Sequence, residues 1–320
     1  IDSRAFFCYA LSMQNSFWNN LPRPFLMLAP QSGVTDSAFR QLAMRNGADV
    51  VFTEFTSVDG VAYSSTPSLE RLKFDASEHP VVCQIFGNKP KFFFDAAKKV
   101  EAAGFDGVDI NFGCPAKKVV GNQGGVSCMR NLVLVRNIVE ATCNAATKIP
   151  VSIKIRRSIK LVDTNGKALP QEHTALDLLE SIKDFPIAAI TIHGRSYERP
   201  FTGDPDFAMI AEVKKRFSGL VIGNGGLNTV TDAKNMLDKT GVDGLALARG
   251  IYGKPWLFQQ IHEYLNTGSY TEKPWGDIVE TAIWHAELMF RLKGERGIVE
   301  MRKHLGWYFK GFPGAVNMRK

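Results

Sequence analysis

Eight short apolar runs rich in Val, Ile and Phe recur along the chain. Each run is continuous rather than alternating, which is typical of strands that are buried on both faces of a parallel sheet. The runs are Phe25–Ala29, Val50–Thr53, Val81–Phe86, Gly107–Asn111, Val151–Ile155, Ala188–Ile192, Leu220–Gly223 and Gly244–Ala248. We therefore predict eight buried parallel strands.

The segments between these runs carry the signals of helices. Thr35 or Asp36 can cap a helix that ends at Gly47, Pro90–Ala103 follows the third run, and Thr229 precedes a helix after the seventh. Eight β/α units over about 230 residues are the size of one barrel. The predicted fold class is therefore α/β, a (β/α)8 TIM barrel followed by a small C-terminal helical domain. A doubly wound sheet is the alternative, although it rarely needs eight similar units.

Two stretches fall outside the β/α pattern. Arg157–Glu172 is polar and contains a glycine and a proline, so we predict a long loop after the fifth strand. Past Trp256 the pattern stops, and Asp277–Leu292 and Gly297–Phe309 have the spacing of two amphipathic helices. The predicted domains are an N-terminal extension (1–20), a barrel (21–260) and a helical domain (261–320) that can continue past Lys320.

Composition narrows the class of protein. The 320 residues are 45% hydrophobic and 22% charged, which excludes a disordered or low-complexity chain. No apolar run reaches the roughly 18 residues of a membrane span. Five cysteines without a C-x-x-C pair argue against disulfides and a metal site, and favour a reducing, cytoplasmic location. The apolar Ala5–Met13 leaves a signal peptide as the alternative, but a polar stretch rather than a cleavage site follows it.

The net charge of +7 is unevenly distributed. Ala286–Lys320 holds eight Lys and Arg against three Asp and Glu, while the rest of the chain is nearly neutral. A basic segment on a neutral body indicates an anionic macromolecule as partner. A solvated helical face is the alternative.

Polar residues gather where the predicted strands end, which is where barrels carry their chemistry. Asn224-Gly225-Gly226 and Ala248-Arg249-Gly250 follow the last two strands. Backbone N–H groups and a guanidinium in such loops can bind a phosphate. Ordinary turn chemistry is the alternative explanation of the glycines.

Other strand ends carry candidate donors and one candidate acid. Gln84, Lys154 and His193 can line a pocket for a flat heteroaromatic ring. Cys114 lies between Gly113 and Pro115 in the loop after the fourth strand, where a thiol can act as acid or nucleophile. Taken singly, Lys154 could be a solvated lysine, His193 a packing residue and Cys114 an inert loop cysteine.

Together these segments resemble the tRNA-dihydrouridine synthases, most closely the bacterial B-type group, over about residues 20–320. The most specific segment is Asn111-Phe112-Gly113-Cys114-Pro115-Ala116-Lys117-Lys118. The others are Leu28-Ala29-Pro30, Gly33-Val34-Thr35-Asp36, Lys154-Ile155-Arg156, Thr191-Ile192-His193-Gly194-Arg195 and Arg302-Lys303-His304-Leu305-Gly306-Trp307-Tyr308.

The resemblance implies a barrel that binds FMN and a helical domain that binds tRNA, with NADPH as reductant. The implied cofactor-binding residues are Pro30, Gln31, Ser32, Gln84, Lys154, His193, Asn224, Gly225, Gly226, Ala248 and Arg249. The implied substrate-binding residues are Asn111, Arg156, Arg195, Arg302 and Lys303. We expect a monomer without a membrane partner.

The resemblance also implies a two-step reaction. NADPH reduces the flavin, and the reduced flavin then transfers hydride to C6 of a uracil flipped out of the tRNA, while Cys114 protonates C5. Lys154 would stabilise the charge that develops on the flavin or on the uracil carbonyl. A free thiol pKa of about 8.5 suits a proton donor better than a thiolate nucleophile.

The chain departs from the family pattern in four places. The first loop usually has a methionine after the proline, where Gln31 and Ser32 stand here. Val126–Met129 replaces a small-residue and leucine run, Ala248 replaces a glycine, and the segment 161–172 is long. The first departure bears on flavin affinity.

Two rival functions are compatible with the residues. An FMN barrel that reduces a free pyrimidine is the enzyme rival, although the basic segment with Trp307 and Tyr308 argues for RNA. A tRNA-binding protein without catalysis is the rival from another class. It is disfavoured by the retention of Cys114, Lys154, His193 and Arg249.

Overall fold

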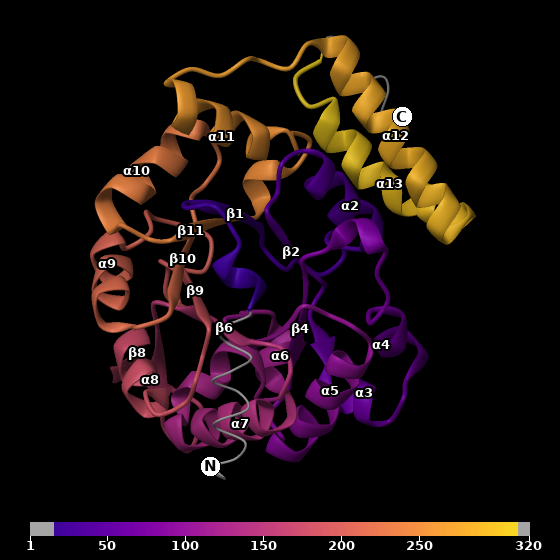
Figure 1. The fold of residues 1–320 in the computed structure, drawn as a ribbon. Helices are drawn as coiled ribbons and strands as arrows, with labels where there is room; N and C mark the ends of the chain where they lie inside the picture. The colour runs from indigo at the N-terminus through magenta and orange to yellow at the C-terminus, as the bar shows by residue number, and fades with distance from the viewer. Residues whose placement is uncertain (1–15, 313–320) are drawn as a thin grey trace.

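A closed ring of eight parallel strands forms the centre of the computed structural model, which describes residues 16–312 (Figure 1). In chain order the strands are β1 (Phe25–Leu28), β2 (Val50–Phe52), β4 (Val81–Phe86), β5 (Gly107–Phe112), β6 (Val151–Arg156), β9 (Ala189–His193), β10 (Leu220–Asn224) and β11 (Gly244–Leu247). The ring closes because β1 pairs with both β2 and β11, and β2 also pairs with β4. The predicted barrel is confirmed, and closure excludes a doubly wound sheet.

The strands are continuous apolar runs because both of their faces are buried. Every residue of β1, β2 and β11 is buried, as the pattern predicted. Inside the barrel, Phe25 and Phe52 pack on Trp18, which is only 2% exposed and belongs to η1 (Phe17–Asn19). This short segment therefore closes the amino-terminal end of the barrel with apolar surface.

Helices and short elements connect the strands. The longer helices are α2 (Ser37–Arg45), α5 (Pro90–Ala102), α7 (Leu132–Ala145), α8 (Ala175–Ile182), α9 (Phe207–Arg216), α10 (Val230–Thr240) and α11 (Leu257–Thr267). The short elements are β3 (Thr56–Ser57), α3 (Val58–Ala62), α4 (Thr66–Glu70), η2 (Ala76–Glu78), α6 (Lys117–Gly121), η3 (Gly125–Arg130) and η4 (Arg249–Ile251). The predicted caps are present: Asp36 accepts a hydrogen bond from the Phe39 N–H, and Thr229 forms a capping box with Asp232.

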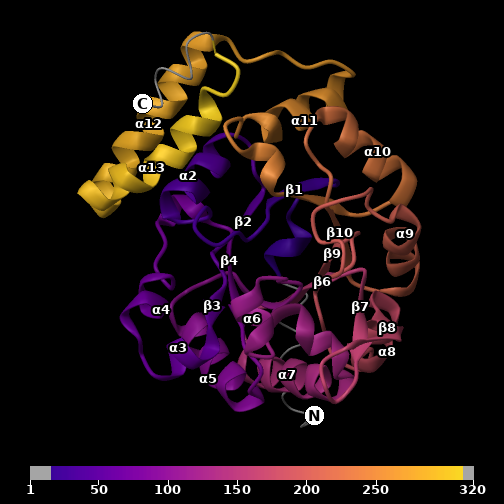
Figure 2. The same cartoon turned by 180° about the vertical axis from the view of Figure 1, so that it is seen from behind.

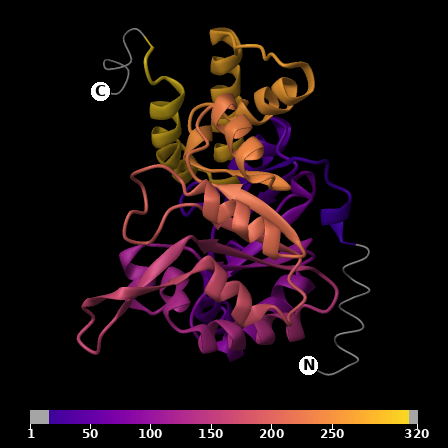
Figure 3. The same cartoon turned by 90° about the vertical axis from the view of Figure 1, so that its left-hand side faces the viewer.

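The predicted long loop Arg157–Glu172 is wrong. The segment forms an antiparallel hairpin of β7 (Ser158–Val162) and β8 (Ala168–Thr174), which projects from the barrel in Figure 3. Its turn is held by Asp163, whose carboxylate accepts N–H bonds from Asn165 and Lys167 at 2.9 Å each. The Asn-Gly pair in this turn is a hairpin signal that the polar composition obscured.

Two C-terminal helices, α12 (Trp275–Lys293) and α13 (Glu295–Tyr308), pack side by side against α2, as Figures 1 and 2 show. They confirm the two predicted amphipathic helices and are called the helical pair below. The proposed domain boundary at residue 260 falls inside α11 and stays a prediction.

Part of the predicted N-terminal extension, including Cys8 and the apolar stretch Ala5–Met13, lies outside the described residues. Within residues 16–312, no helix has the length and apolar character required to cross a bilayer.

Candidate active site

A buried carboxylate lies below the mouth of the barrel, the end where the strands finish. Asp109 of β5 is fully buried, and it accepts hydrogen bonds from Gln84 Nε2 and Ser152 Oγ, both at 2.7 Å. Burial raises the pKa of Asp109 to about 6, while these two donors and the Lys154 charge oppose that shift. The carboxylate thus orients the Gln84 amide.

The Gln84 amide in turn orients Asn111. Gln84 Oε1 accepts from Asn111 Nδ2 at 2.8 Å, which directs Asn111 Oδ1 toward the following loop. That oxygen accepts the N–H groups of Gly113 at 3.0 Å and Cys114 at 2.9 Å. Arg156 Nε also donates to the Gly113 carbonyl at 2.8 Å. We call Ser152, Asp109, Gln84 and Asn111 the relay, because each member fixes the next.

Cys114 is the partly buried thiol at the end of the relay. Burial raises its pKa above the usual value, and the Ala116 N–H and the charges of Arg156 and Lys154 only oppose that shift. The thiol is therefore protonated at neutral pH, which fits a proton donor and not a thiolate nucleophile.

Lys154 connects the relay side of the mouth to the last strands. Its ammonium donates to Asn224 Oδ1 at 3.0 Å, and Asn224 is held in turn by its Nδ2 bond to the Ala246 carbonyl at 2.7 Å. Burial and the nearby Arg156 charge lower the pKa of Lys154 to about 8. The lysine is therefore charged at neutral pH but loses its proton more readily than a surface lysine.

His193 lies among cations. Its Nδ1 accepts the Arg195 N–H at 3.2 Å, and burial together with the charges of Lys154, Arg156, Arg195 and Arg249 lowers its pKa to about 2. The ring is neutral at any physiological pH. Four cationic side chains close to one neutral ring favour an anionic ligand.

The loops after β10 and β11 form a small cavity of about 60 Å³. It is lined by His193, Arg195, Asn224, Gly225, Gly226, Leu227, Asn228, Ala246, Ala248, Arg249 and Gly250. A Cβ on Gly250 would lie 1.9 Å from the Leu227 carbonyl oxygen, so only glycine lets the two loops approach. Arg195 Nη1 is buried there with no hydrogen-bond partner among the described residues. These groups fit a phosphate or another small oxyanion.

The loop after β1 contributes Pro30, Gln31 and Ser32 to the mouth. Gln31 is partly buried and its Nε2 donates to the Tyr252 hydroxyl at 2.5 Å, whereas its Oε1 is buried without a partner among residues 16–312. Ser32 is exposed and lines a cavity of about 820 Å³.

This larger cavity lies between the end of β4 and the segment 116–124 that follows Cys114. Phe55 and Phe86 meet edge to face across it, with ring centroids 5.1 Å apart, and Lys118 lies on its rim. Aromatic faces beside a cation are suited to a nucleobase and its phosphate.

The two predicted substrate-binding residues of the helical pair lie on α13, outside the barrel, and differ in their contacts. Arg302 is exposed on α13, whereas Lys303 donates a hydrogen bond to the Gly33 carbonyl in the loop after β1. In this structure Lys303 therefore joins α13 to the loop after β1. The other predicted residues come together at the mouth.

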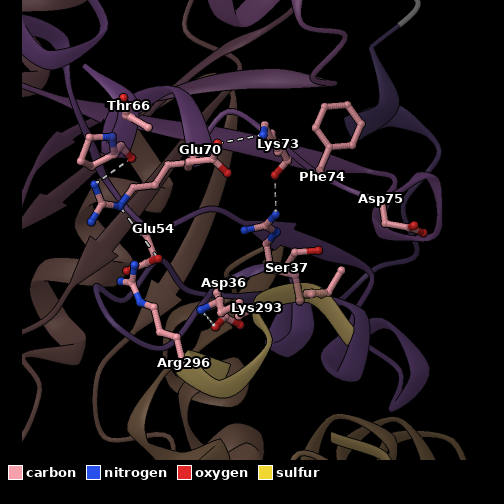
Figure 4. A pocket seen from close by; sticks show the side chains of 14 residues that line it. Asp36, Ser37, Glu54, Thr66, Glu70, Lys73, Phe74, Asp75, Lys293 and Arg296 are labelled. Carbon is pink, nitrogen blue, oxygen red and sulfur yellow. Dashed lines mark hydrogen bonds and ion pairs between the residues drawn. The ribbon is translucent and has the colours of Figure 1, made fainter. Parts of the chain in front are cut away.

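A further cavity, of about 660 Å³, lies where the helical pair meets the barrel (Figure 4). Its charged side chains pair with one another: Lys73 with Glu70 at 2.8 Å, and Lys293 with Asp36 at 2.5 Å. Because these charges are already neutralised, this cavity lacks the excess of cations found at the strand ends.

With this geometry described, the chain can be compared with known proteins. A sequence model of the dihydrouridine synthase (Dus) family matches residues 27–320. A probable tRNA-dihydrouridine synthase from Rickettsia conorii is 37% identical over 297 residues, which is 92% of this chain and 87% of the relative. The chain belongs to the dihydrouridine synthase family.

The match extends to the B-type group of the family. A tRNA-dihydrouridine synthase B from Pseudomonas aeruginosa is 36% identical over 296 residues, 92% of this chain and 86% of the relative. The resemblance to the B-type synthases is therefore confirmed. Among solved structures, an old yellow enzyme homologue from Zymomonas mobilis has a TM-score of 0.53 at 15% identity, over 82% of this chain and 92% of that one. That likeness concerns the fold alone.

Two residues of this dihydrouridine synthase site were missed by sequence reasoning. Asp109 was read as part of a strand, although a charged residue inside an apolar run was a usable signal because a buried carboxylate needs partners. Tyr252 carried no signal, since its contact with Gln31 joins residues 221 positions apart.

Proposed function

We propose that this protein is a flavin-dependent tRNA-dihydrouridine synthase that reduces the C5=C6 bond of a uridine in tRNA, with FMN as cofactor and NADPH as reductant. The observation that carries the proposal is a protonated Cys114, fixed by Asn111 beside the Lys154 ammonium, in the same barrel mouth as an oxyanion cavity. The names of the relatives from Rickettsia conorii and Pseudomonas aeruginosa support the substrate.

The cavity between the last two loops supports FMN as the cofactor. Arg195, Arg249 and the glycine backbone would hold its phosphate, and Lys154, His193 and the first loop would contact the ring system. When bound, the flavin supplies the hydride chemistry that no amino-acid side chain can perform.

The side chains then have separate tasks. Cys114 holds the proton destined for C5, and Asn111 fixes the loop that carries this thiol. Lys154 places a positive charge near the ring, where negative charge develops during hydride transfer. Arg156 is buried and anchors the Gly113 carbonyl, so in this proposal it supports the Cys114 loop as well as the substrate.

Two features support a nucleotide within RNA as the substrate. The 820 Å³ cavity is lined by Ala116, two residues after Cys114, and has room for a base removed from its stack, with Phe55 and Phe86 at its wall. The described part of the basic segment lies mostly on the helical pair, which contacts the loop after β1 through Lys303, and Arg302 is exposed there. A free pyrimidine would not fill this cavity and would not contact the basic segment.

The test incubates the purified protein with FMN, NADPH and unmodified tRNA, and then measures dihydrouridine in the digested RNA by mass spectrometry. We expect dihydrouridine at one mapped position. Free uridine should reoxidise the reduced flavin far more slowly than tRNA does. Equal rates would favour the free-pyrimidine reductase. Bound flavin and bound tRNA without product would favour the non-catalytic binder.

A further inference from the structure

The loop after β1, residues 29–36, is the meeting point of the barrel and the helical pair. Its backbone is fixed locally, because the Gln31 N–H donates to Thr35 Oγ1 at 3.1 Å and the Gln31 carbonyl accepts from the N–H groups of Val34 and Thr35. The loop therefore holds its shape by itself. These backbone bonds do not fix the Gln31 side chain, whose position depends on contacts outside the loop.

That side chain is joined to the helical pair through Tyr252. Gln31 Nε2 donates to the Tyr252 hydroxyl at 2.5 Å, and the Tyr252 ring stacks on Trp307 of α13 with centroids 4.0 Å apart and planes 11° apart. The stack has little freedom, because Gly253 lies against the α13 backbone: a Cβ there would be 2.2 Å from the Trp307 carbonyl oxygen. A shift of α13 therefore moves the partner of Gln31.

The same loop receives two other contacts from the helical pair. Lys303 donates to the Gly33 carbonyl. Lys293 pairs with Asp36 at 2.5 Å, and Figure 4 draws this pair. These contacts hold the backbone and the start of α2. Only the Tyr252 link acts on a side chain with an unsatisfied atom, since Gln31 Oε1 is the buried acceptor that has no partner within residues 16–312.

Resting on the proposed function, we propose that Gln31 is a positioning residue that couples the helical pair to the flavin through Tyr252 and Trp307. The Gln31 amide can face both ways, because its Nε2 contacts Tyr252 and its Oε1, which has no partner among the described residues, can accept from a ring N–H of the flavin. Binding of tRNA on the helical pair would thereby change the environment of the flavin.

The first test is a double-mutant cycle on flavin affinity, measured by the quenching of FMN fluorescence. Tyr252→Phe removes one hydroxyl and keeps the stack on Trp307, and Gln31→Met removes the amide while keeping a side chain of similar length. We expect each to raise the FMN dissociation constant by about twofold to tenfold, which is the range of one hydrogen bond. The double variant should be no weaker than Gln31→Met alone, because both changes break one link.

The second test uses the flavin spectrum. Unmodified tRNA added to the flavin-loaded protein should shift the visible absorption of the wild type and of Tyr264→Phe, a matched control on α11. Tyr252→Phe should lose most of that shift. The proposal is overturned if the effects of the two substitutions on the FMN dissociation constant multiply in the double variant. It is also overturned if tRNA shifts the absorption of Tyr252→Phe as much as that of the wild type, or if tRNA leaves the wild-type spectrum unchanged. A wild type that binds no FMN would instead overturn the proposed function itself.

Discussion

The two halves of the barrel mouth are organised by different means. On the side of β4, β5 and β6, polar side chains bind one another in the relay, from Ser152 through Asp109 and Gln84 to Asn111. On the side of β9, β10 and β11, glycine backbone and cations surround a small cavity, and the buried Arg195 Nη1 has no partner among the described residues.

The difference indicates which half needs a ligand. The relay satisfies its own hydrogen bonds, so it can hold Cys114 in place whether or not a ligand is bound. On the cationic side, burial and the nearby cationic charges lower the pKa of His193, and an anion would relieve the repulsion among those charges. Changes on the relay side should therefore affect chemistry and stability, whereas changes on the cationic side should affect ligand affinity.

The largest expected effect is at Cys114. Cys114→Ala should reduce dihydrouridine formation by about 10²- to 10⁴-fold, because it removes the proton donor. FMN binding and flavin reduction by NADPH should remain near wild type. The matched control is Cys143→Ala, a buried cysteine of α7 away from the mouth. Wild-type dihydrouridine yield from Cys114→Ala would contradict the assignment.

The next effect concerns the cationic half. Arg249→Ala should weaken FMN binding by about tenfold to a hundredfold, the range of a charge-assisted hydrogen bond, and should weaken riboflavin binding much less. Titration of both flavins measures this ratio. Arg216→Ala is the control, because Arg216 is exposed on α9 and paired with Glu212. Equal losses for FMN and riboflavin would remove Arg249 from the phosphate site.

A smaller effect distinguishes the two halves of the barrel mouth by how much a substitution lowers the stability of the protein. Asn111→Ala should lower the free energy of unfolding by roughly 2 kcal/mol, because the N–H groups of Gly113 and Cys114 and the Gln84 carbonyl oxygen lose their partner. Arg249→Ala, at an exposed position, should change it by less than about 0.5 kcal/mol. Urea denaturation measures both. Similar losses of unfolding free energy in the two variants would contradict the proposed difference between the two halves.

The smallest effect is a pH dependence at Lys154. Its pKa is lowered to about 8, so its positive charge is present below pH 8 and lost as the pH rises through that value. FMN affinity should then fall about twofold to fivefold between pH 7 and pH 9. Lys154→Met should bind FMN more weakly and lack this component. An identical pH profile in both proteins would show that another group titrates.

The fold was predictable because the eight strands are apolar throughout and their helices carry strong caps, such as Asp36 and Thr229. The hairpin β7–β8 was not predicted because most of its strand residues are only partly buried or exposed and the polar residues around Asn165-Gly166 were read as a loop. Composition alone does not distinguish an exposed hairpin from a loop; turn chemistry does.

The site was predictable where a side chain has its effect at the end of its own strand, as with Cys114, Lys154 and His193. It was not predictable where a role depends on strand register. Asp109 is in register with Gln84 on one side and Ser152 on the other, and the relay exists only because these three positions are adjacent. Strand register and loop contacts such as the one between Gln31 and Tyr252 are properties of the tertiary structure, so the local sequence does not predict them.

The pairing of the first strand with the last has a consequence for synthesis of the chain. Phe25 is in register with Gly244, so the sheet keeps two open edges until β11 has left the ribosome. Open edges invite pairing with other chains. Because the helical pair is translated after β11, it reaches a barrel that can already be closed. The contacts of Lys293, Lys303 and Trp307 therefore form after those of the barrel strands, and they join α12 and α13 to the loop after the first strand.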